Sequence, residues 1–165
     1  MTTFYTIDSA NARIPEVREL LLRLRDDRDE LVRLRDQLAA LRAGGDPADG
    51  PESAGIDASI EPETPADEAA AQAEGSSPNG RDAVREGQRI ALRTQGVVDQ
   101  MQASVATIDG WGIALRDIQA GLIDFPALVS GRQVWLCWQL GEGHVDWWHE
   151  LSEGFGGRRR LADLA

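Results

Sequence analysis

The side chains of this chain that could do chemistry are concentrated in its last third. All five tryptophans, both histidines and the only cysteine lie between Trp111 and His149. Carboxylate, imidazole and thiolate groups are the ligands that divalent transition metals take in proteins. The polar members of this stretch therefore form the first candidate site: Asp124, Cys137, Glu142, His144, His149 and Glu150.

The spacing of these residues restricts a metal interpretation. His144 and His149 are five positions apart, so on one strand they would point to opposite faces. Neither an HExxH nor a CxxC motif is present. We expect no cofactor, and the alternative is a divalent metal held by Asp124, His149 and Glu150. The competing structural interpretation is a buried His149 that is hydrogen-bonded to a carboxylate such as Asp124.

Two further candidates involve Cys137 and the C-terminal arginines. Cys137 could act as a nucleophile with His149 as its base, but a thiol flanked by tryptophans more often behaves as a small buried hydrophobe. We therefore predict no catalytic residue. Consecutive glycines followed by arginines could bind an anion, and the residues are Gly156, Gly157, Arg158 and Arg159. The alternative for this segment is a flexible basic tail over residues 158–165.

The elements that position these residues begin with two helices. Apolar side chains spaced by alternating threes and fours predict a long helix over residues 15–42, broken in its seam by Asp27 and preceded by one turn at 8–13. A second helix is predicted over residues 81–109, and the two form an antiparallel hairpin. The second helix offers smaller side chains, so five leucines are candidates for self-association: Leu20, Leu24, Leu31, Leu34 and Leu38.

From residue 110 the pattern is typical of short strands. We predict strands at 113–116, 121–125, 133–140 and 144–151, with residues 4–6 as an edge strand. Strand 133–140 is apolar on both faces and should be central. A four-residue loop at 141–144 pairs Trp138 with Trp147 and Leu136 with His149, which places Cys137 and His149 on opposite faces. The predicted fold is α+β, a helical hairpin with a small Trp-rich antiparallel sheet.

Charge and composition divide the chain into five segments. The net charge is −11, and nine of the acidic residues lie in a Pro-, Gly- and Ala-rich stretch without a basic residue. That stretch, residues 44–80, predicts a disordered acidic linker. It separates residues 1–43 from a helix at 81–109, a sheet domain at 110–157 and the tail at 158–165. So acidic a chain is not expected to bind nucleic acid.

The chain also resembles a known family. In order along the sequence, the strings that carry the resemblance are FYTIDSAN (4–11), IPE (14–16), GLIDFP (121–126), GR (131–132), VWLCW (134–138), GE (141–142), WWHE (147–150) and GF (154–155). Together they are similar to the uncharacterised bacterial family DUF2203. The resemblance implies two helices and a small sheet, and it implies no activity, substrate or catalytic residue.

These observations favour a non-enzymatic interaction or scaffold protein of the bacterial cytoplasm. The expected partner is a protein or a second copy, as a homodimer, and no membrane segment is apparent. The expected partner surface comprises Asp124, Trp138, Glu142, Trp147, His149 and Glu150. The alternative is a metal-binding or small-ligand protein, with hydrolytic chemistry, whose site lies around Asp124, Glu142, His149 and Glu150.

Overall fold

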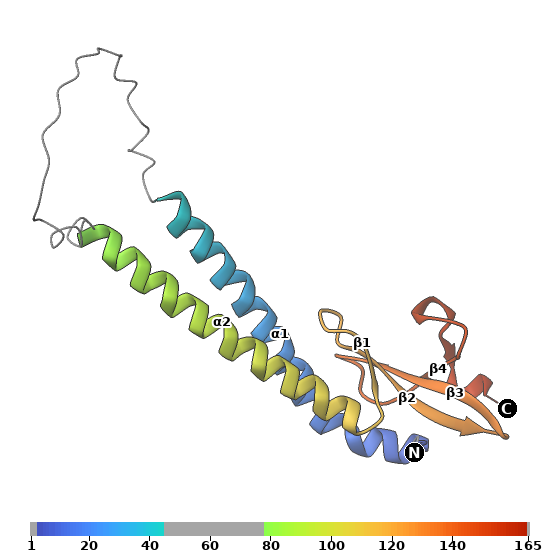
Figure 1. Ribbon diagram of the computed structural model, residues 1–165. Coiled ribbons are helices and arrows are strands. Elements are labelled where there is room, and N and C mark those ends of the chain that lie inside the picture. The colour runs from blue at the N-terminus through green and yellow to red at the C-terminus, as the bar shows by residue number, and fades with distance from the viewer. Residues whose placement is uncertain (1–2, 45–77, 165) are drawn as a thin grey trace, which may run out of the picture.

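The fold is α+β, as the sequence predicted. The computed structural model describes residues 3–44 and 78–164. Two long helices form an antiparallel hairpin, and a five-stranded antiparallel sheet in the order β1-β2-β3-β4-β5 follows them (Figure 1). The elements are α1 (Ile7–Ala43), α2 (Pro78–Gly110), β1 (Ala114–Asp117), β2 (Leu122–Val129), β3 (Arg132–Gln139), β4 (Trp147–Glu150), η1 (Phe155–Gly157), β5 (Arg159–Arg160) and η2 (Leu161–Asp163).

Most of the predicted acidic linker lies outside the described residues, and its C-terminal end at 78–80 already belongs to α2. Within residues 3–44 and 78–164, no helix is long and apolar enough to cross a membrane.

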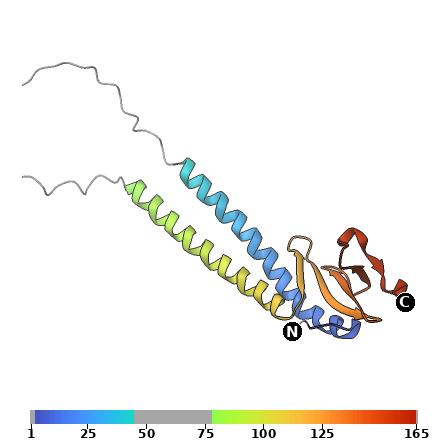
Figure 2. The ribbon, with the colours of Figure 1, turned by 45° about the vertical axis from the view of Figure 1, so that its right-hand side comes forward.

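The sheet sits at one end of the hairpin, and the other end of the hairpin projects away from it (Figures 1 and 2). Two separate apolar clusters correspond to these two ends. The larger joins the N-terminal half of α1 to Ile108 of α2 and to the sheet. The smaller, centred on Leu34, Ile90 and Val97, contains residues of the two helices only. Among residues 3–44 and 78–164, the far half of the hairpin is therefore held by helix–helix packing alone.

Helix α1 begins at Ile7, so the turn predicted at 8–13 and the helix predicted from residue 15 form one continuous helix. Thr6 Oγ1 accepts a hydrogen bond from the Ser9 backbone N–H at 3.1 Å, and Ser9 Oγ accepts one from the Thr6 N–H at 2.9 Å. This reciprocal cap satisfies donors that the first helical turn leaves free. Pro15 then lies inside the helix, where the prediction had placed it in the first turn. It removes one backbone donor, and the cap and the turns on both sides keep the helix continuous.

The leucine seam is used mainly within the chain. Leu24 and Leu34 are buried, at 0% and 6% exposure. Leu20 packs against the larger cluster, and Leu31 and Leu38 pack against the smaller one. The sheet and the second helix thus take up much of the apolar surface that suggested self-association, and self-association through these leucines stays a prediction.

Replacing Leu24 by Ala should lower the free energy of unfolding by about 2–5 kcal/mol, because the substitution leaves a cavity in the larger apolar cluster. Leu22, 46% exposed two positions earlier on the same helix, is the matched control, and Leu22→Ala should cost less than about 1 kcal/mol. Urea unfolding measures both variants. Equal losses would show that Leu24 is not an interior residue.

The register of the sheet differs from the prediction by one residue. Trp135 pairs with His149 and Leu136 with Trp148, where Leu136 had been expected opposite His149. The cause is the connection before β4, which spans residues 140–146 instead of 141–144. Glu142 binds the end of β3 by accepting from the Gln139 backbone N–H at 2.8 Å. The side chain of Asn11 in α1 accepts from the Val145 N–H at 2.8 Å.

Two other elements also differ from the prediction. Residues 4–6 form no strand, although the Tyr5 N–H donates to the Pro126 carbonyl at 2.7 Å. Pro126 has no backbone N–H to donate in turn to residues 4–6, so these residues cannot continue the hydrogen-bond pattern of a strand at this point. In the predicted flexible tail, Arg159 and Arg160 form β5 and pair with Trp148 and Trp147 of β4.

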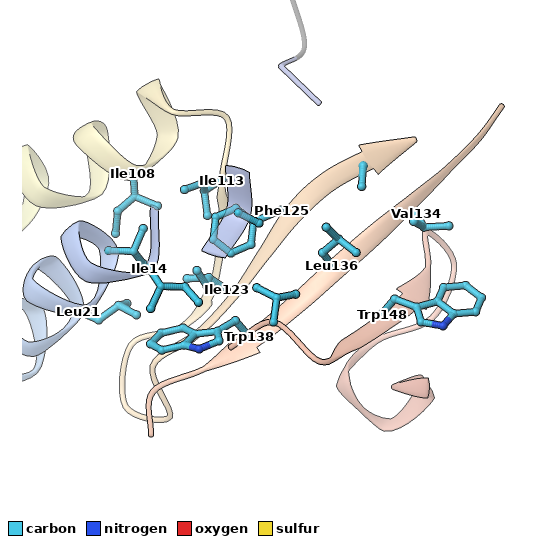
Figure 3. Close-up of a cluster of buried hydrophobic side chains, with 14 of the residues drawn as sticks. Ile14, Leu21, Ile108, Ile113, Ile123, Phe125, Val134, Leu136, Trp138 and Trp148 are labelled. Atoms are coloured by element: carbon cyan, nitrogen blue, oxygen red, sulfur yellow. The ribbon is translucent and has the colours of Figure 1, made fainter. Parts of the chain in front are cut away.

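The two faces of the sheet have different roles. Phe125, Leu136 and Trp148 form one cross-strand row on the core face. On the same face, Ile123 and Trp138 lie next to Ile14 and Leu21 of α1 (Figure 3). The neighbouring row, Asp124, Cys137 and Trp147, is on the opposite face, which we call the outer face. β3 is the central strand and is buried on both faces, as its sequence predicted.

Candidate metal centre

Three side chains from neighbouring strands meet on the outer face of the sheet. They are Asp124 of β2, Cys137 of β3 and His149 of β4. Each offers one ligand atom, these atoms lie within 4.8 Å of one another, and all three residues are buried. The observed register produces this meeting. With Cys137 opposite Trp147, His149 shares the face of Cys137, which corrects the prediction that they lie on opposite faces.

The hydrogen bonds of His149 define the state of its ring. Nδ1 lies 2.9 Å from the Glu150 backbone carbonyl, which can only accept, so Nδ1 carries a hydrogen and donates. Nε2 lies 3.1 Å from Asp124 Oδ2. In a neutral imidazole this nitrogen has a lone pair, and an ionised carboxylate is also an acceptor. A proton or a metal ion is required to make this buried contact favourable.

The Asp124 carboxylate is incompletely satisfied. Its Oδ2 accepts from Arg116 Nε at 2.7 Å, and Asp124 is only 2% exposed. Its Oδ1 is buried and has no hydrogen-bond partner among the described residues. Leaving an ionised oxygen buried without a partner costs free energy, and such atoms often indicate an unseen ligand. The guanidinium of Arg116 stacks on Trp135 at 4.9 Å, which fixes its plane beside the carboxylate.

Cys137 is a buried thiol in surroundings that disfavour the thiolate. Burial, followed by the nearby Asp124 carboxylate, raises the pKa of its thiol to about 12. A nucleophilic cysteine needs the opposite environment, one that stabilises the thiolate. The shared face with His149 therefore does not produce a catalytic dyad. A metal ion could still take this residue as a ligand, because coordination displaces the thiol proton.

The metal-free protein should lose stability in alkali through Cys137. The folded chain keeps the thiol proton up to a pKa of about 12, whereas the unfolded chain loses it near 9.0. The stabilisation is complete below the unfolded pKa and disappears as the pH rises through the folded pKa. With chelator present, unfolding free energies measured from pH 8 to pH 11 should fall more steeply for the wild type than for Cys137→Ala. Equal slopes, or rapid alkylation of the native thiol at neutral pH, would contradict this.

A small cavity opens beside the three residues. Its volume is about 190 Å³, and Arg116 and the segment after β4, including Glu153 and Phe155, complete its wall. Glu153 Oε1 accepts from Arg159 Nη2 at 2.7 Å, and its buried Oε2 has no partner among the described residues. Glycine at position 157 leaves space for the Glu153 side chain. A Cβ on residue 157 would lie only 2.7 Å from Glu153 Cβ, which is too close for two carbon atoms. The cavity thus adjoins two carboxylates with unsatisfied oxygens.

The other two predicted carboxylates lie elsewhere. Glu150 lies opposite Val134, on the other face of the sheet from His149, and pairs with Arg132 at 3.0 Å. Glu142 is in the loop before β4 and binds Arg158 at 2.8 Å. Neither is among the three residues whose ligand atoms meet, and their place in the site stays a prediction.

The predicted aromatic residues do not form one surface. Trp138 is fully buried on the core face, and its Nε1 donates to the Glu142 carbonyl at 3.2 Å. Trp147 is on the outer face, where Arg158 and Arg160 stack on it at 4.9 and 4.6 Å. His144 is exposed in a separate groove along α1.

The geometry does not support the predicted anion site. Gly156 and Gly157 end a three-residue 3-10 helix. Arg158 is bound to Glu142, and Arg159 is bound to Glu153 at 2.7 Å. Both arginines thus neutralise carboxylates of the chain itself.

Sequence reasoning missed Arg116 and Glu153 as parts of the site. Neither belongs to a motif, and Glu153 reaches the cavity only because the chain turns back after β4. Cys137 belonged to the first candidate set, and the predicted register placed it on the opposite face from His149. The correct register alone would have grouped it with Asp124 and His149.

Comparison with known families gives one result. The sequence profile described as "Uncharacterized conserved protein (DUF2203)" matches residues 3–161. The chain belongs to the DUF2203 family. The match confirms the resemblance seen in the sequence and covers both the hairpin and the sheet. Searches of the curated proteins and of the solved structures found no match. The chemistry of this DUF2203 chain therefore has to be argued from its own residues.

Proposed function

We propose that this DUF2203 protein binds a zinc-class metal ion through Asp124, Cys137 and His149. The proposal rests on two acceptor atoms that face each other, His149 Nε2 and Asp124 Oδ2. Nδ1 of His149 is held as a donor by the Glu150 carbonyl, so Nε2 presents its lone pair toward Asp124. Metal-bound histidines are oriented in this way, with the second ring nitrogen donating to a carbonyl or carboxylate.

The distances suit a small divalent ion. Zinc binds nitrogen and oxygen ligands at about 2.0–2.2 Å, and His149 Nε2 and Asp124 Oδ2 are 3.1 Å apart. With both atoms about 2.05 Å from an ion, the angle between the two ligand bonds would be roughly 100°, which is close to the tetrahedral value. A set of one sulfur, one nitrogen and one oxygen favours zinc over magnesium or calcium, which prefer oxygen alone.

The number of ligands indicates what the ion would do. Structural zinc sites use four protein ligands, whereas catalytic sites use three and leave a position for water or substrate. Here three ligands adjoin a cavity of about 190 Å³, so a fourth position would face that cavity. The site suits Lewis-acid or hydrolytic chemistry on a small molecule. A metal thiolate also fits a reducing compartment such as the cytoplasm.

The structural alternative is a proton in place of the ion. A protonated His149 paired with Asp124 would satisfy the same contact and fix β4 against β2. It would leave Asp124 Oδ1 and the cavity unexplained. Metal binding and this ion pair are mutually exclusive at Nε2, so a binding measurement separates them.

Titration of the chelator-treated protein with Co²⁺ tests the proposal. Tetrahedral Co²⁺ with a thiolate ligand gives intense visible and near-ultraviolet bands, and we expect one equivalent to bind. His149→Ala should weaken binding at least a hundredfold, because it removes one of only three ligands. His144→Ala is the matched control, since His144 is the only other histidine and is exposed in its loop.

Cys137→Ser should remove the charge-transfer band while the protein stays folded, as monitored by its tryptophan fluorescence. Absence of any cobalt spectrum in the wild-type protein would overturn the proposed function. Equal losses in the two histidine variants would show that the ion binds somewhere other than the outer face of the sheet.

A second candidate function is the interaction or scaffold role that the sequence favoured. The far half of the hairpin extends beyond the sheet (Figure 2). It carries exposed apolar side chains. Val32 on α1 and Val84 and Leu92 on α2 are 37%, 61% and 76% exposed. We propose that this arm contacts a protein, and a second copy of the chain is the simplest partner to test.

Sedimentation equilibrium should then show a dimer that Leu92→Gln weakens at least tenfold. Leu151→Gln, which changes a half-exposed leucine near the sheet, is the control and should have no effect. A monomer at all concentrations would contradict self-association through the arm.

A further inference from the structure

We propose that the metal-loaded site binds a small monocarboxylate, with one oxygen on the open coordination position and the other on the Arg116 guanidinium. This inference rests on the proposed metal site and names the class of ligand that site takes. Of the described residues, Arg116 alone lines both the cavity beside the proposed metal ligands and an open groove of about 470 Å³.

The guanidinium of Arg116 is held in place but keeps free donors. Its Nε donates to Asp124 Oδ2 at 2.7 Å, so it lies one hydrogen bond away from a proposed metal ligand. Stacking on Trp135 at 4.9 Å fixes its plane. The side chain is 43% exposed, and its two terminal nitrogens make no hydrogen bond to the described residues. A planar pair of donors with no protein partner is suited to a carboxylate.

The net charge of the metal-loaded site favours a ligand with a single negative charge. The two charges of the ion balance those of Asp124 and the Cys137 thiolate. Glu153 and Arg159 form a pair at 2.7 Å and cancel each other. The charge of Arg116 remains, so a monoanion would neutralise the cavity. Without the ion there is no open coordination position for the first carboxylate oxygen, which predicts that carboxylate binding depends on the metal.

The space limits the size of the ligand. A cavity of about 190 Å³ holds roughly six water molecules at about 30 Å³ each. It accommodates the carboxylate end of a ligand and a few further atoms. A longer ligand would extend past Arg116 into the open groove, which Arg28 and the exposed Gln119 also line. The cavity therefore holds the carboxylate end of the ligand, and the rest of a longer ligand would lie outside it.

Acetate is the probe for the test, and the Co²⁺-loaded full-length protein is the sample. We expect acetate to change the visible bands in a saturable way at constant ionic strength. Arg116→Gln should weaken acetate binding by roughly ten- to a hundredfold, the range for a lost charge-assisted hydrogen bond. Arg160→Gln is the matched control, because Arg160 also stacks on an outer-face tryptophan, at 4.6 Å from Trp147.

Arg116→Lys keeps the positive charge but lacks the planar pair of donors, so its affinity for acetate should fall by an intermediate amount. This variant also provides the test if Arg116→Gln does not fold. Unchanged acetate affinity in Arg116→Gln, or no response of the wild-type bands to acetate, would overturn the inference. Both results differ from failure of the metal proposal, in which no cobalt bands appear before acetate is added.

Discussion

The contact between His149 Nε2 and Asp124 Oδ2 is the constraint on which the site depends. Two atoms that both accept hydrogen bonds lie 3.1 Å apart in the interior, on residues that are each 2% exposed. Such a contact is repulsive unless positive charge lies between or beside the two atoms. Arg116 supplies part of that charge from the side, and the remainder must be a proton or a metal ion at Nε2. The ligand set and the cavity favour the ion.

The architecture keeps this site separate from the helical hairpin. α1 packs on the core face of the sheet, whereas the three proposed ligands lie on the outer face under the segment that follows β4. In the part of the chain that the structure describes, the apolar cluster of the far half contains residues of the two helices only. A partner could therefore bind the arm without covering the cavity, and the two proposed functions are compatible in one molecule. Both helices reach the core-face cluster, which is where a structural change at one end could affect the other.

Much of the fold could be predicted from the sequence, because its signals are local. The alternating spacing of the leucines predicted the helical hairpin, and the apolar stretch around Leu136 predicted a central strand that is buried on both faces. The start of α1 could not be predicted from Pro15 alone, since the cap between Thr6 and Ser9 outweighs one missing backbone bond. Self-association could not be decided either, because the sheet covers much of the leucine seam.

The site was harder to predict than the fold, because it depends on register. A loop of four residues and one of seven are both compatible with the sequence after β3, and they place opposite side chains on the outer face. Asn11, more than 130 positions away, helps to fix the longer loop by accepting from the Val145 N–H. No local pattern contains that information. The same difference decides whether Cys137 is a buried hydrophobe behind His149 or a neighbour of its Nε2.

X-ray absorption at the zinc edge, on protein loaded with one equivalent of Zn²⁺, tests the central claim most directly. The proposed ligands predict one sulfur at about 2.3 Å and two or three nitrogen or oxygen atoms at about 2.0–2.1 Å. A shell with that single sulfur would identify Cys137, because the chain contains no other cysteine. A shell of nitrogen and oxygen alone would contradict the account and leave the His149–Asp124 contact as a protonated structural pair.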